Sequence, residues 1–255
     1  MKKIILSAFA AAVLTFSMAD QARASEGAAL PYVDWSWNGP FGTFDRGALK
    51  RGTQVYLEVC ASCHSAKLVA YRNLMEIGFS EDEVKKIAAD FEVVDGPNED
   101  GEMFNRPATL SDKFAQPYPN DNAARAANNG ALPPDLSLMV KARKDGANYL
   151  YGLMTGYRDE PPEGFKVSDG MQYNTVFPGH QIAMPSPIFE DGVEYADGTK
   201  ASVDQMSKDI TTFMAWTASP ELEERKRMGV KVLIFLFVFT GLLIALKRKI
   251  WADVH

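Results

Sequence analysis

The chain has 255 residues, of which 46% are hydrophobic and 24% are charged, so its composition is that of a globular protein rather than a disordered or fibrous one. The net charge of −6 argues against a nucleic-acid partner, because binding phosphates requires a cationic surface, but it leaves room for a basic protein partner. Two cysteines are too few for a disulfide framework in a chain of this length.

The beginning of the chain has the pattern of a secretory signal peptide. Two lysines and an apolar run over residues 4–19 precede small residues at Ala22 and Ala24, which form a cleavage site. We therefore expect residues 1–24 to be removed and the mature chain to begin near Ser25, outside the inner membrane. The alternative is an anchor that is never removed, but the apolar run is short for a membrane span.

Helical patterns dominate the middle of the chain and strand alternation is rare, so the predicted fold class is mainly α. Ser80 followed by Glu83 forms a capping box that begins one of these helices. The expected helices cover residues 45–58, 80–90, 120–130, 134–157 in two segments broken at Gly146, and 199–229, the last continuing towards the membrane. The segments 91–119 and 158–200 are expected loops, and loops of this length are uncommon unless they hold something such as a bulky cofactor.

Both cysteines and one of the three histidines lie in CASCH, residues 60–64. Cys-x-x-Cys-His is the attachment signature of c-type haem: each thiol adds to one vinyl group, and His64 then lies under the iron as an axial ligand. A zinc site would need a second Cys/His cluster and a thioredoxin-like redox pair would need a βαβ context, and the sequence has neither. The single motif predicts one covalently bound haem c, attached through Cys60 and Cys63.

The second axial ligand has two candidates in FPGHQIAMPSP, residues 177–187. A methionine ligand raises the haem potential, because a soft thioether favours ferrous iron. Met184 lies in a proline-bounded loop, where Pro185 and Pro187 restrict the residues before them and the chain can be held extended against a haem face. His180 follows a Pro-Gly turn and remains the alternative on spacing alone.

The end of the chain carries a long apolar run. From Met228 to Leu246 the only charged residue is Lys231, whose stem can reach the membrane interface. This length crosses about 30 Å of hydrocarbon, so we expect a transmembrane helix over residues 228–246; a buried core helix would show a polar face. Because basic residues flank both ends, the orientation rests on the signal peptide, which predicts an exported body and a cytoplasmic tail, residues 247–255.

Beyond these motifs, the chain resembles the cytochrome c1 family, the haem subunits of the cytochrome bc1 complex, over nearly all of the mature sequence and in the same order. The segments that carry the resemblance are RGTQVYLEVCASCHSAKLVAYRNL (51–74), GEMFNRPATLSDKFAQPYPNDNAARAANNGALPPDLSLMVKAR (101–143), FPGHQIAMPSPI (177–188) and ERKRMGVKVL (224–233). The resemblance implies a cytochrome c-like haem domain over 25–227 with long loop insertions and one C-terminal transmembrane helix. The bacterial style of the signal peptide indicates the periplasmic side of a bacterial inner membrane.

The resemblance also assigns site residues by position. It supports Cys60 and Cys63 as the haem attachment, His64 as an iron ligand, and Met184 as the match to the family's methionine ligand. The positions that match residues around the haem are Asn128, Pro133, Pro134, Arg143 and Tyr149. The last two match contacts to a haem propionate, which suits the planar fork of an arginine and the hydroxyl of a tyrosine, although a surface ion pair and a core aromatic would also explain them.

The function that the resemblance implies is one-electron transfer from the Rieske iron–sulfur protein to a soluble cytochrome c, next to cytochrome b in the membrane. The chain itself makes or breaks no substrate bond, and quinol oxidation belongs to the whole complex. Two alternatives stay open: a membrane-tethered monohaem cytochrome that serves an oxidase or another respiratory complex, and a haem enzyme with an open sixth position. Some bacterial members carry an extra cysteine pair that clamps the methionine side, and this chain has none.

Acidic residues in the long loops are candidates for docking a basic cytochrome, because opposite charges raise the rate of encounter. Solvated loop charge is the plain alternative for any one of them. The first acidic group is Glu99, Asp100 and Glu102, and the second acidic group is Asp159, Glu160 and Glu163.

Overall fold

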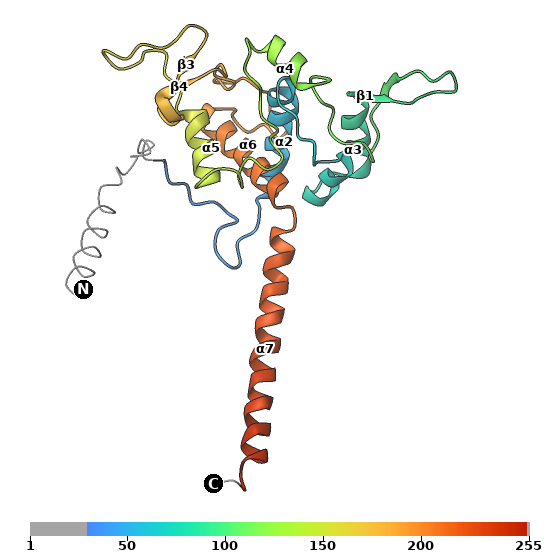
Figure 1. The fold of residues 1–255 in the computed structure, drawn as a ribbon, viewed down its shortest axis with the longest axis vertical. Coiled ribbons are helices and arrows are strands. Elements are labelled where there is room, and N and C mark those ends of the chain that lie inside the picture. Colours follow the sequence, from blue (N-terminus) through green and yellow to red (C-terminus); the bar gives the residue numbers. More distant parts are fainter. Residues whose placement is uncertain (1–29, 254–255) are drawn as a thin grey trace, which may run out of the picture.

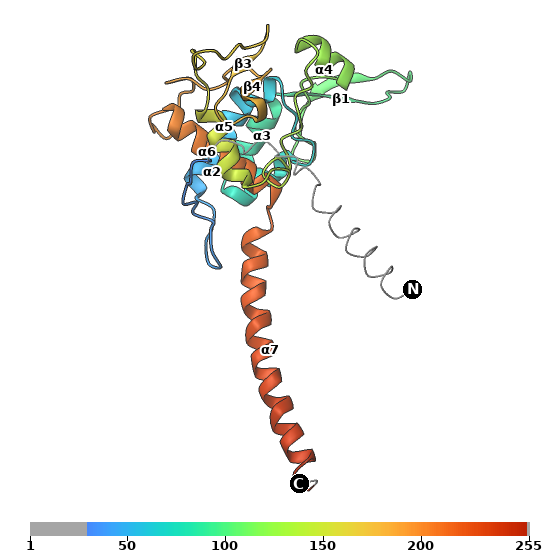
Figure 2. The same ribbon diagram turned by 60° about the vertical axis from the view of Figure 1, so that its left-hand side comes forward.

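The structure, a computed structural model, describes residues 30–253, so the signal peptide expected over residues 1–24 lies outside the described residues. A head of helices and loops is carried on one long C-terminal helix, which projects from the head in both Figure 1 and Figure 2. The predicted class is confirmed: the described residues are mainly helical, with short strands in two small antiparallel sheets.

Helix α2 (Arg46–Glu58) lies at the centre of the head and packs against α6 (Val203–Ala218). Asp45 begins α2, because its carboxylate accepts a hydrogen bond from Ala48 N at 2.9 Å and so satisfies one N–H that the first turn leaves without a partner. The last turn of α2 leads directly into the cysteine motif, so the packing of this helix positions the motif.

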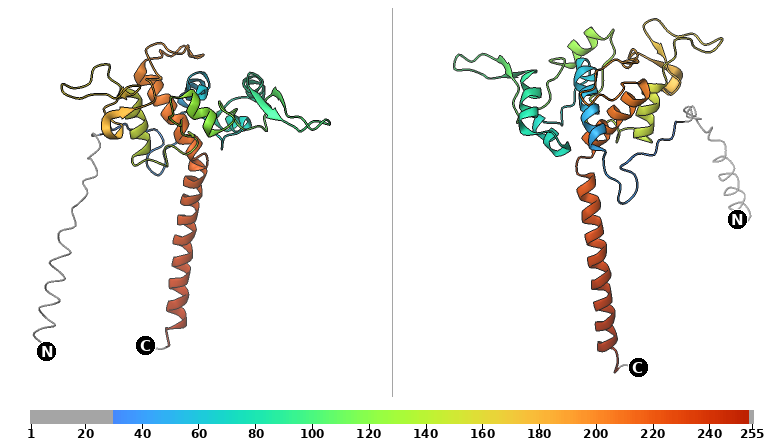
Figure 3. Two further views of the ribbon diagram at one scale, coloured as in Figure 1. Left: turned by 45° about the horizontal axis from the view of Figure 1, so that its top comes forward. Right: turned by 180° about the vertical axis from the view of Figure 1, so that it is seen from behind.

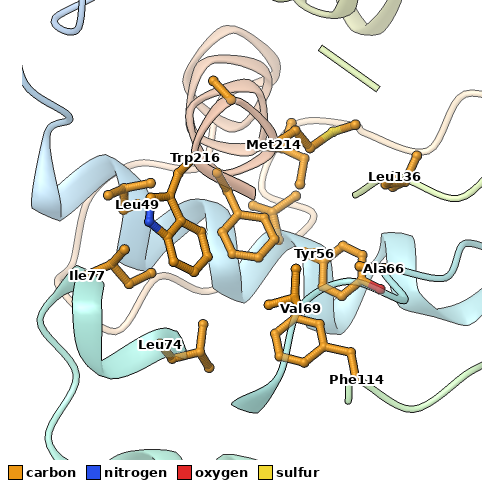
Figure 4. Close-up of a cluster of buried hydrophobic side chains, with 14 of the residues drawn as sticks. Leu49, Tyr56, Ala66, Val69, Leu74, Ile77, Phe114, Leu136, Met214 and Trp216 are labelled. Atoms are coloured by element: carbon orange, nitrogen blue, oxygen red, sulfur yellow. The ribbon is translucent and has the colours of Figure 1, made fainter. Parts of the chain in front are cut away.

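The contact between α2 and α6 depends on a glycine and on a pair of aromatic rings. A Cβ on Gly52 would lie 2.1 Å from the carbonyl oxygen of Asp209, so only glycine allows this close approach. The ring of Tyr56 on α2 lies 5.6 Å from that of Phe213 on α6, and burial of these rings holds the two helices together. Tyr56 also stacks at 5.5 Å on Phe114, which comes from a loop outside these helices; Figure 4 shows Tyr56 and Phe114.

Three further helical elements follow the cysteine motif: the 3-10 helix η3 (Tyr71–Ile77), α3 (Glu81–Ala89) and α4 (Asp121–Ala127). The predicted capping box is confirmed at the start of α3. Ser80 Oγ accepts a hydrogen bond from Glu83 N at 3.3 Å, and Ser80 N donates to Glu83 Oε2 at 2.6 Å.

An antiparallel hairpin of β1 (Glu92–Asp95) and β2 (Phe104–Pro107) lies inside the segment 91–119, where the prediction of loop alone was wrong. The hairpin projects from the head (Figure 1). Both strands are largely exposed, so they have no buried face and no apolar alternation that a sequence pattern could reveal.

The expected helix in the first part of 134–157 is also wrong. Residues 136–145 form successive turns, and only α5 (Gly146–Thr155) is helical. The physical reason is that Leu136 N donates a hydrogen bond to Ser65 O at 2.8 Å, which commits this segment to the cysteine motif rather than to a helix of its own.

The segment 158–200 is mostly loop, as predicted, with one small ordered region. Strands β3 (Gln172–Tyr173) and β4 (Gln181–Ile182) pair antiparallel on either side of the 3-10 turn η4 (Pro178–His180). This region presents Met184, which follows β4 directly.

The predicted continuous helix over 199–229 is wrong at one point. Helix α6 ends at Ala218, and α7 (Leu222–Ile250) begins after a break at Pro220, which lacks an N–H and disfavours helical backbone in the residue before it. Helix α7 has a window of mean hydropathy 2.5, and none of this window is buried, so it is a candidate membrane span by length and composition. The expected span, residues 228–246, lies within it.

Candidate haem-binding site

The cysteine motif forms a tight turn at the end of α2. The 3-10 helix η2 (Cys60–Ser62) follows Val59, and the carbonyl of Cys60 accepts hydrogen bonds from Cys63 N at 3.2 Å and from His64 N at 2.8 Å. Both cysteines are free thiols and both are half-buried. The turn therefore holds two thiols and an imidazole within a single turn of chain, as the spacing predicted.

His64 is held at both its backbone and its ring. The Tyr56 hydroxyl donates to the His64 carbonyl at 3.2 Å, and His64 Nδ1 lies 2.8 Å from the carbonyl oxygen of Pro134. Because a carbonyl only accepts hydrogen bonds, Nδ1 carries the proton and Nε2 keeps its lone pair for a metal. Burial lowers the pKa of His64, and this effect outweighs the Pro134 carbonyl, which acts to raise it. The lowered pKa favours the neutral ring that a metal requires.

A carboxylate that the sequence analysis did not single out joins the proline segment to the cysteine motif. Asp135 Oδ2 accepts hydrogen bonds from Ser65 Oγ at 2.9 Å and Lys67 N at 2.8 Å, and its Oδ1 accepts one from Ser137 N at 2.9 Å. Burial acts to raise the pKa of Asp135, but these hydrogen bonds outweigh it and hold the pKa below its usual value. We call the hydrogen bonds of Asp135 to residues 65, 67 and 137 the clamp. The segment PPDLS, residues 133–137, could have indicated it from the sequence, because this segment supplies both Asp135 and the Pro134 carbonyl.

Leu136 completes the clamp by entering the hydrophobic core. It is 8% exposed and belongs to the same buried cluster as Tyr56 and Ala66, as Figure 4 shows. The carbonyl that fixes the His64 ring is therefore supported by the two residues that follow it, through the hydrogen bonds of Asp135 and the buried packing of Leu136.

The thiol environment does not suit a redox pair. Burial, with a smaller contribution from Cys63, raises the pKa of the Cys60 thiol to about 12, whereas redox-active cysteines have lowered pKa values. Among residues 30–253 there is also no group of three or more His, Cys, Asp or Glu side chains placed to hold a metal ion by themselves. Two thiols on one turn, followed by an imidazole with Nε2 available, are a donor set that fits a haem.

Met184 lies half-buried beyond β4, on a segment that is hydrogen-bonded to the chain just after α5. Its carbonyl accepts a hydrogen bond from the Tyr157 hydroxyl at 3.1 Å. Burial raises the pKa of Tyr157, with a smaller contribution from Tyr149. Tyr149 itself is half-buried in α5, where it packs against the hydrophobic core. Tyr157 thus supports the Met184 segment, while Pro134 supports the ring of His64.

His180, the competing ligand, is engaged in a different set of contacts. Its Nδ1 is 3.3 Å from the Asn174 carbonyl oxygen, and its ring lies 6.0 Å from the ring of Tyr173 and 6.3 Å from that of Phe165. The ring is half-buried in this aromatic group rather than freely exposed. These contacts give His180 a packing role, which favours Met184 as the ligand.

Asn174 explains how the Met184 loop is stiffened without a disulfide. It is fully buried, its Nδ2 donates to Leu153 O at 2.8 Å, and its Oδ1 accepts from Val176 N at 2.9 Å and Phe177 N at 3.1 Å. A buried amide with these partners resists displacement, because moving it would leave polar groups without hydrogen bonds. Sequence reasoning missed Asn174, since a lone Asn in a loop is more often a turn residue.

The remaining predicted residues are not gathered into one cluster by their protein contacts. Asn128 caps α4, with its Nδ2 donating to Ala124 O at 2.7 Å and to Tyr118 Oη at 3.1 Å. Pro133 is half-buried beside the clamp. Arg143 is exposed and donates only to the neighbouring Ala142 carbonyl, at 3.1 Å, among the contacts of the described residues.

Comparison with known proteins places the chain in one family. The family model of the Cytochrome C1 family matches residues 35–254. The chain is 46% identical to cytochrome c1 of Rhodospirillum rubrum, covering 100% of this chain and 99% of that protein. It is 51% identical to the mitochondrial cytochrome c1 heme protein of Saccharomyces cerevisiae, covering 91% of this chain and 75% of that protein.

A longer relative matches as well. The chain is 45% identical to the cytochrome b/c1 of Bradyrhizobium diazoefficiens over 99% of its own length, but it spans only 40% of that protein. The family match extends over the haem motif, the clamp, the Met184 segment and the C-terminal helix alike. The chain therefore belongs to the Cytochrome C1 family.

Proposed function

We propose that the chain is the c-type haem subunit of a bc1 complex and that it passes single electrons from a Rieske iron–sulfur protein to a soluble cytochrome c. Membership of the family gives the coarser role, haem-based electron transfer in that complex. The observation that carries the proposal is that the imidazole of His64 is held by hydrogen bonds and follows the two cysteine thiols in the same turn of the chain. A haem bound at this turn supplies an iron that gains and loses one electron.

In this proposal the residues of the chain attach the haem, orient its iron ligands and set its potential. Cys60 and Cys63 form the two thioether links, and His64 offers Nε2 because its Nδ1 donates to the Pro134 carbonyl. Met184 supplies the sixth ligand, whose thioether sulfur stabilises the reduced state. Both ligand segments are held by hydrogen bonds to the rest of the head, at the ring of His64 and at the carbonyl of Met184.

The residues that match haem neighbours in the family are proposed to surround the haem here as well. Pro133 and Pro134 lie near the haem edge with Asn128, and their half-buried to exposed positions suit the rim of a cofactor. Arg143 is free of a carboxylate among the contacts of the described residues, so its guanidinium is available for a propionate. Tyr149 is proposed for the same propionate.

The proposed topology has four parts. Residues 1–24 direct export and are removed, residues 25–227 form the haem domain in the periplasm, α7 crosses the inner membrane over 228–246, and residues 247–255 stay in the cytoplasm. The apolar and unburied surface of α7 supports the membrane part. Cytochrome b and the Rieske protein are the proposed partners within the membrane complex.

The two acidic groups are the proposed docking sites for a basic acceptor. All six residues are exposed, and the loops that carry them extend to opposite sides of the head in both views of Figure 3. A single acceptor contacts one region at a time, so we propose that only one of the two groups belongs to the docking face.

The sixth-ligand assignment is tested by two substitutions in the haem-loaded full-length chain. We expect Met184→Leu to lower the midpoint potential by well over about 59 mV, which is more than tenfold in a one-electron equilibrium, and to remove the absorption band of methionine–iron ligation. His180→Ala should leave both properties unchanged. The opposite pattern would mean that His180 is the ligand and that the Met184 assignment is wrong.

Membership of a bc1 complex is tested by mild-detergent purification through a tag on the chain. A b-haem protein and an iron–sulfur protein should co-purify with quinol–cytochrome c reductase activity. Co-purification with an oxidase alone would overturn the proposal in favour of a tethered electron shuttle.

A further inference from the structure

A short loop without charged residues precedes α2. From Trp35 to Phe44 it contains no Asp, Glu, Lys or Arg, a property that it shares with the longer segment 171–189. We call residues 36–43 the N-terminal loop. Its position beside α7, rather than its composition alone, distinguishes it.

The N-terminal loop has a closed neck. Thr43 N donates to Ser36 O at 3.1 Å, which joins its two ends. A Cβ on Gly42 would lie 2.0 Å from the Asn38 carbonyl oxygen, so the two sides of the loop approach too closely for any residue but glycine at position 42. The rings of Trp35 and Trp37 are stacked at 4.8 Å at the base of the loop.

The loop is fastened to the first turns of α7. Lys226 Nζ donates to the carbonyl oxygens of Trp37 at 2.6 Å and Gly42 at 2.9 Å, on both sides of the loop. Just beyond the loop, Phe44 N donates to Glu223 Oε1 at 2.9 Å. Glu223 and Lys226 are three residues apart and share one face of the helix, so the loop is attached along that face.

The loop points towards the apolar part of α7. Figures 1, 2 and 3 all show the chain before α2 descending beside the first turns of α7 and then returning to the head. The apolar run begins at Met228, two residues after Lys226, which is about 3 Å along the helix axis. The loop therefore reaches the level at which the helix enters hydrocarbon.

The turn at the end of the loop exposes a large apolar side chain. Residues 39–41 form a turn in which Gly39 has a φ of 69°, a conformation that glycine tolerates. Phe41 is 80% exposed, although it follows Pro40 in a loop whose two ends are joined rather than in a chain terminus. A phenylalanine held out in this way loses the benefit of burial unless another phase covers it.

We infer that the N-terminal loop is a second membrane contact of the chain, with Phe41 inserted at the boundary between lipid headgroups and acyl chains. The occupant is lipid rather than protein because the loop is fastened to the helix that itself enters the bilayer, at the residues just before its apolar run. Aromatic side chains are favoured at this depth. Two contacts, the helix and the loop, would fix the tilt of the head on the membrane, which one helix alone leaves free.

The test measures the depth of position 41 in a bilayer. Phe41→Cys in the full-length, haem-loaded chain leaves one free thiol for a fluorophore, because Cys60 and Cys63 are consumed by the haem, and the protein is placed in phosphatidylcholine–phosphatidylglycerol nanodiscs. One control is Val94→Cys, which is 68% exposed on the hairpin of β1 and β2. The other is Phe237→Cys, which is 83% exposed within α7. An unchanged haem spectrum verifies the fold of each variant.

We expect lipid carrying a nitroxide near its headgroup to cause a loss of fluorescence at position 41 and no loss at position 94, while a nitroxide deep in the acyl chain quenches position 237 most strongly. Position 41 behaving like position 94 would overturn the inference. The same measurement in the assembled complex separates lipid from protein. If position 41 loses its lipid quenching there and is also shielded from a water-soluble quencher, another subunit covers Phe41 and the lipid assignment is wrong.

Discussion

Replacement of Gly52 by alanine tests whether the crossing of α2 and α6 positions the haem motif. The added Cβ would lie 2.1 Å from the Asp209 carbonyl oxygen and 2.8 Å from Phe213 Cβ. The first of these falls about 1.3 Å short of ordinary van der Waals contact, which begins at 3.4 Å. Asp209 cannot move aside easily, because Arg51 holds both of its carboxylate oxygens, at 2.9 and 3.1 Å, and the Asp209 side chain is fully buried.

The expected magnitude follows from two opposing effects. Alanine in place of glycine in a helix interior stabilises it by about 1 kcal/mol. Forcing extra volume into a packed contact costs about 1–3 kcal/mol and occasionally more, and the clash of Gly52→Ala with backbone belongs at the upper end of that range. We therefore expect a net loss of about 2 kcal/mol, which corresponds to a fall in Tm of roughly 4–8 °C for a domain of this size.

The assay is thermal unfolding of the haem-loaded chain, followed by helical circular dichroism. Gly47→Ala is the matched control, because Gly47 lies in the same helix and its added Cβ would approach only side-chain atoms and no backbone, with Asp45 Oδ1 at 3.2 Å and Arg51 Nη1 at 3.3 Å. It should leave Tm unchanged or raise it. A Tm for Gly52→Ala equal to or above that of Gly47→Ala would refute the close helix crossing.

Three further outcomes are expected. Arg106 pairs with Asp112 at 2.7 Å and, followed by Thr109, holds the pKa of this carboxyl well below its usual value. The ionised carboxylate therefore stabilises the folded state above pH about 4, and this stability is lost as the pH falls below that value. Asp112→Asn should flatten the acid dependence of unfolding between pH about 2 and 6, and an unchanged slope would exclude the Arg106–Asp112 pair as its source. Asn174→Ala should weaken the methionine–iron absorption band and lower Tm, because Val176 N and Phe177 N lose their hydrogen-bond acceptor. An absorption band as strong as in the wild type would mean that Asn174 does not position Met184. Neutralising the docking acidic group should reduce the salt dependence of the second-order rate of acceptor reduction, and neutralising the other should not; if neither changes it, steering lies elsewhere.

The chemistry of the haem motif could be predicted from sequence because it depends on local spacing. Cys60, Cys63 and His64 fall within one turn of chain, so their proximity needs no tertiary information. The N-cap of α3 at Ser80 and the apolar run of α7 are local in the same sense, and the structure agrees with both. These features are decided by residues within a few positions of one another.

Features that depend on contacts between distant segments were missed or wrong. The turns over 136–145 replaced an expected helix because Asp135 and Leu136 are committed to the cysteine motif, some seventy positions earlier in the chain. Asn174 and Tyr157 became part of the ligand support only through hydrogen bonds to Leu153 and Met184. Hydrogen bonds between distant residues leave no periodic pattern in the sequence, because the local sequence around each partner is compatible with other conformations as well.

By itself, then, the sequence determined that this protein carries a haem-attachment signature and an apolar helix long enough to cross a membrane, because attachment chemistry and hydrophobic length are encoded locally. Only the tertiary structure decided how the imidazole of His64 is oriented, which residues stiffen the Met184 loop, and where the loop of residues 36–43 lies against α7. Orientation of this kind requires hydrogen-bond partners and buried surfaces from separate segments, and these exist only after the chain has folded.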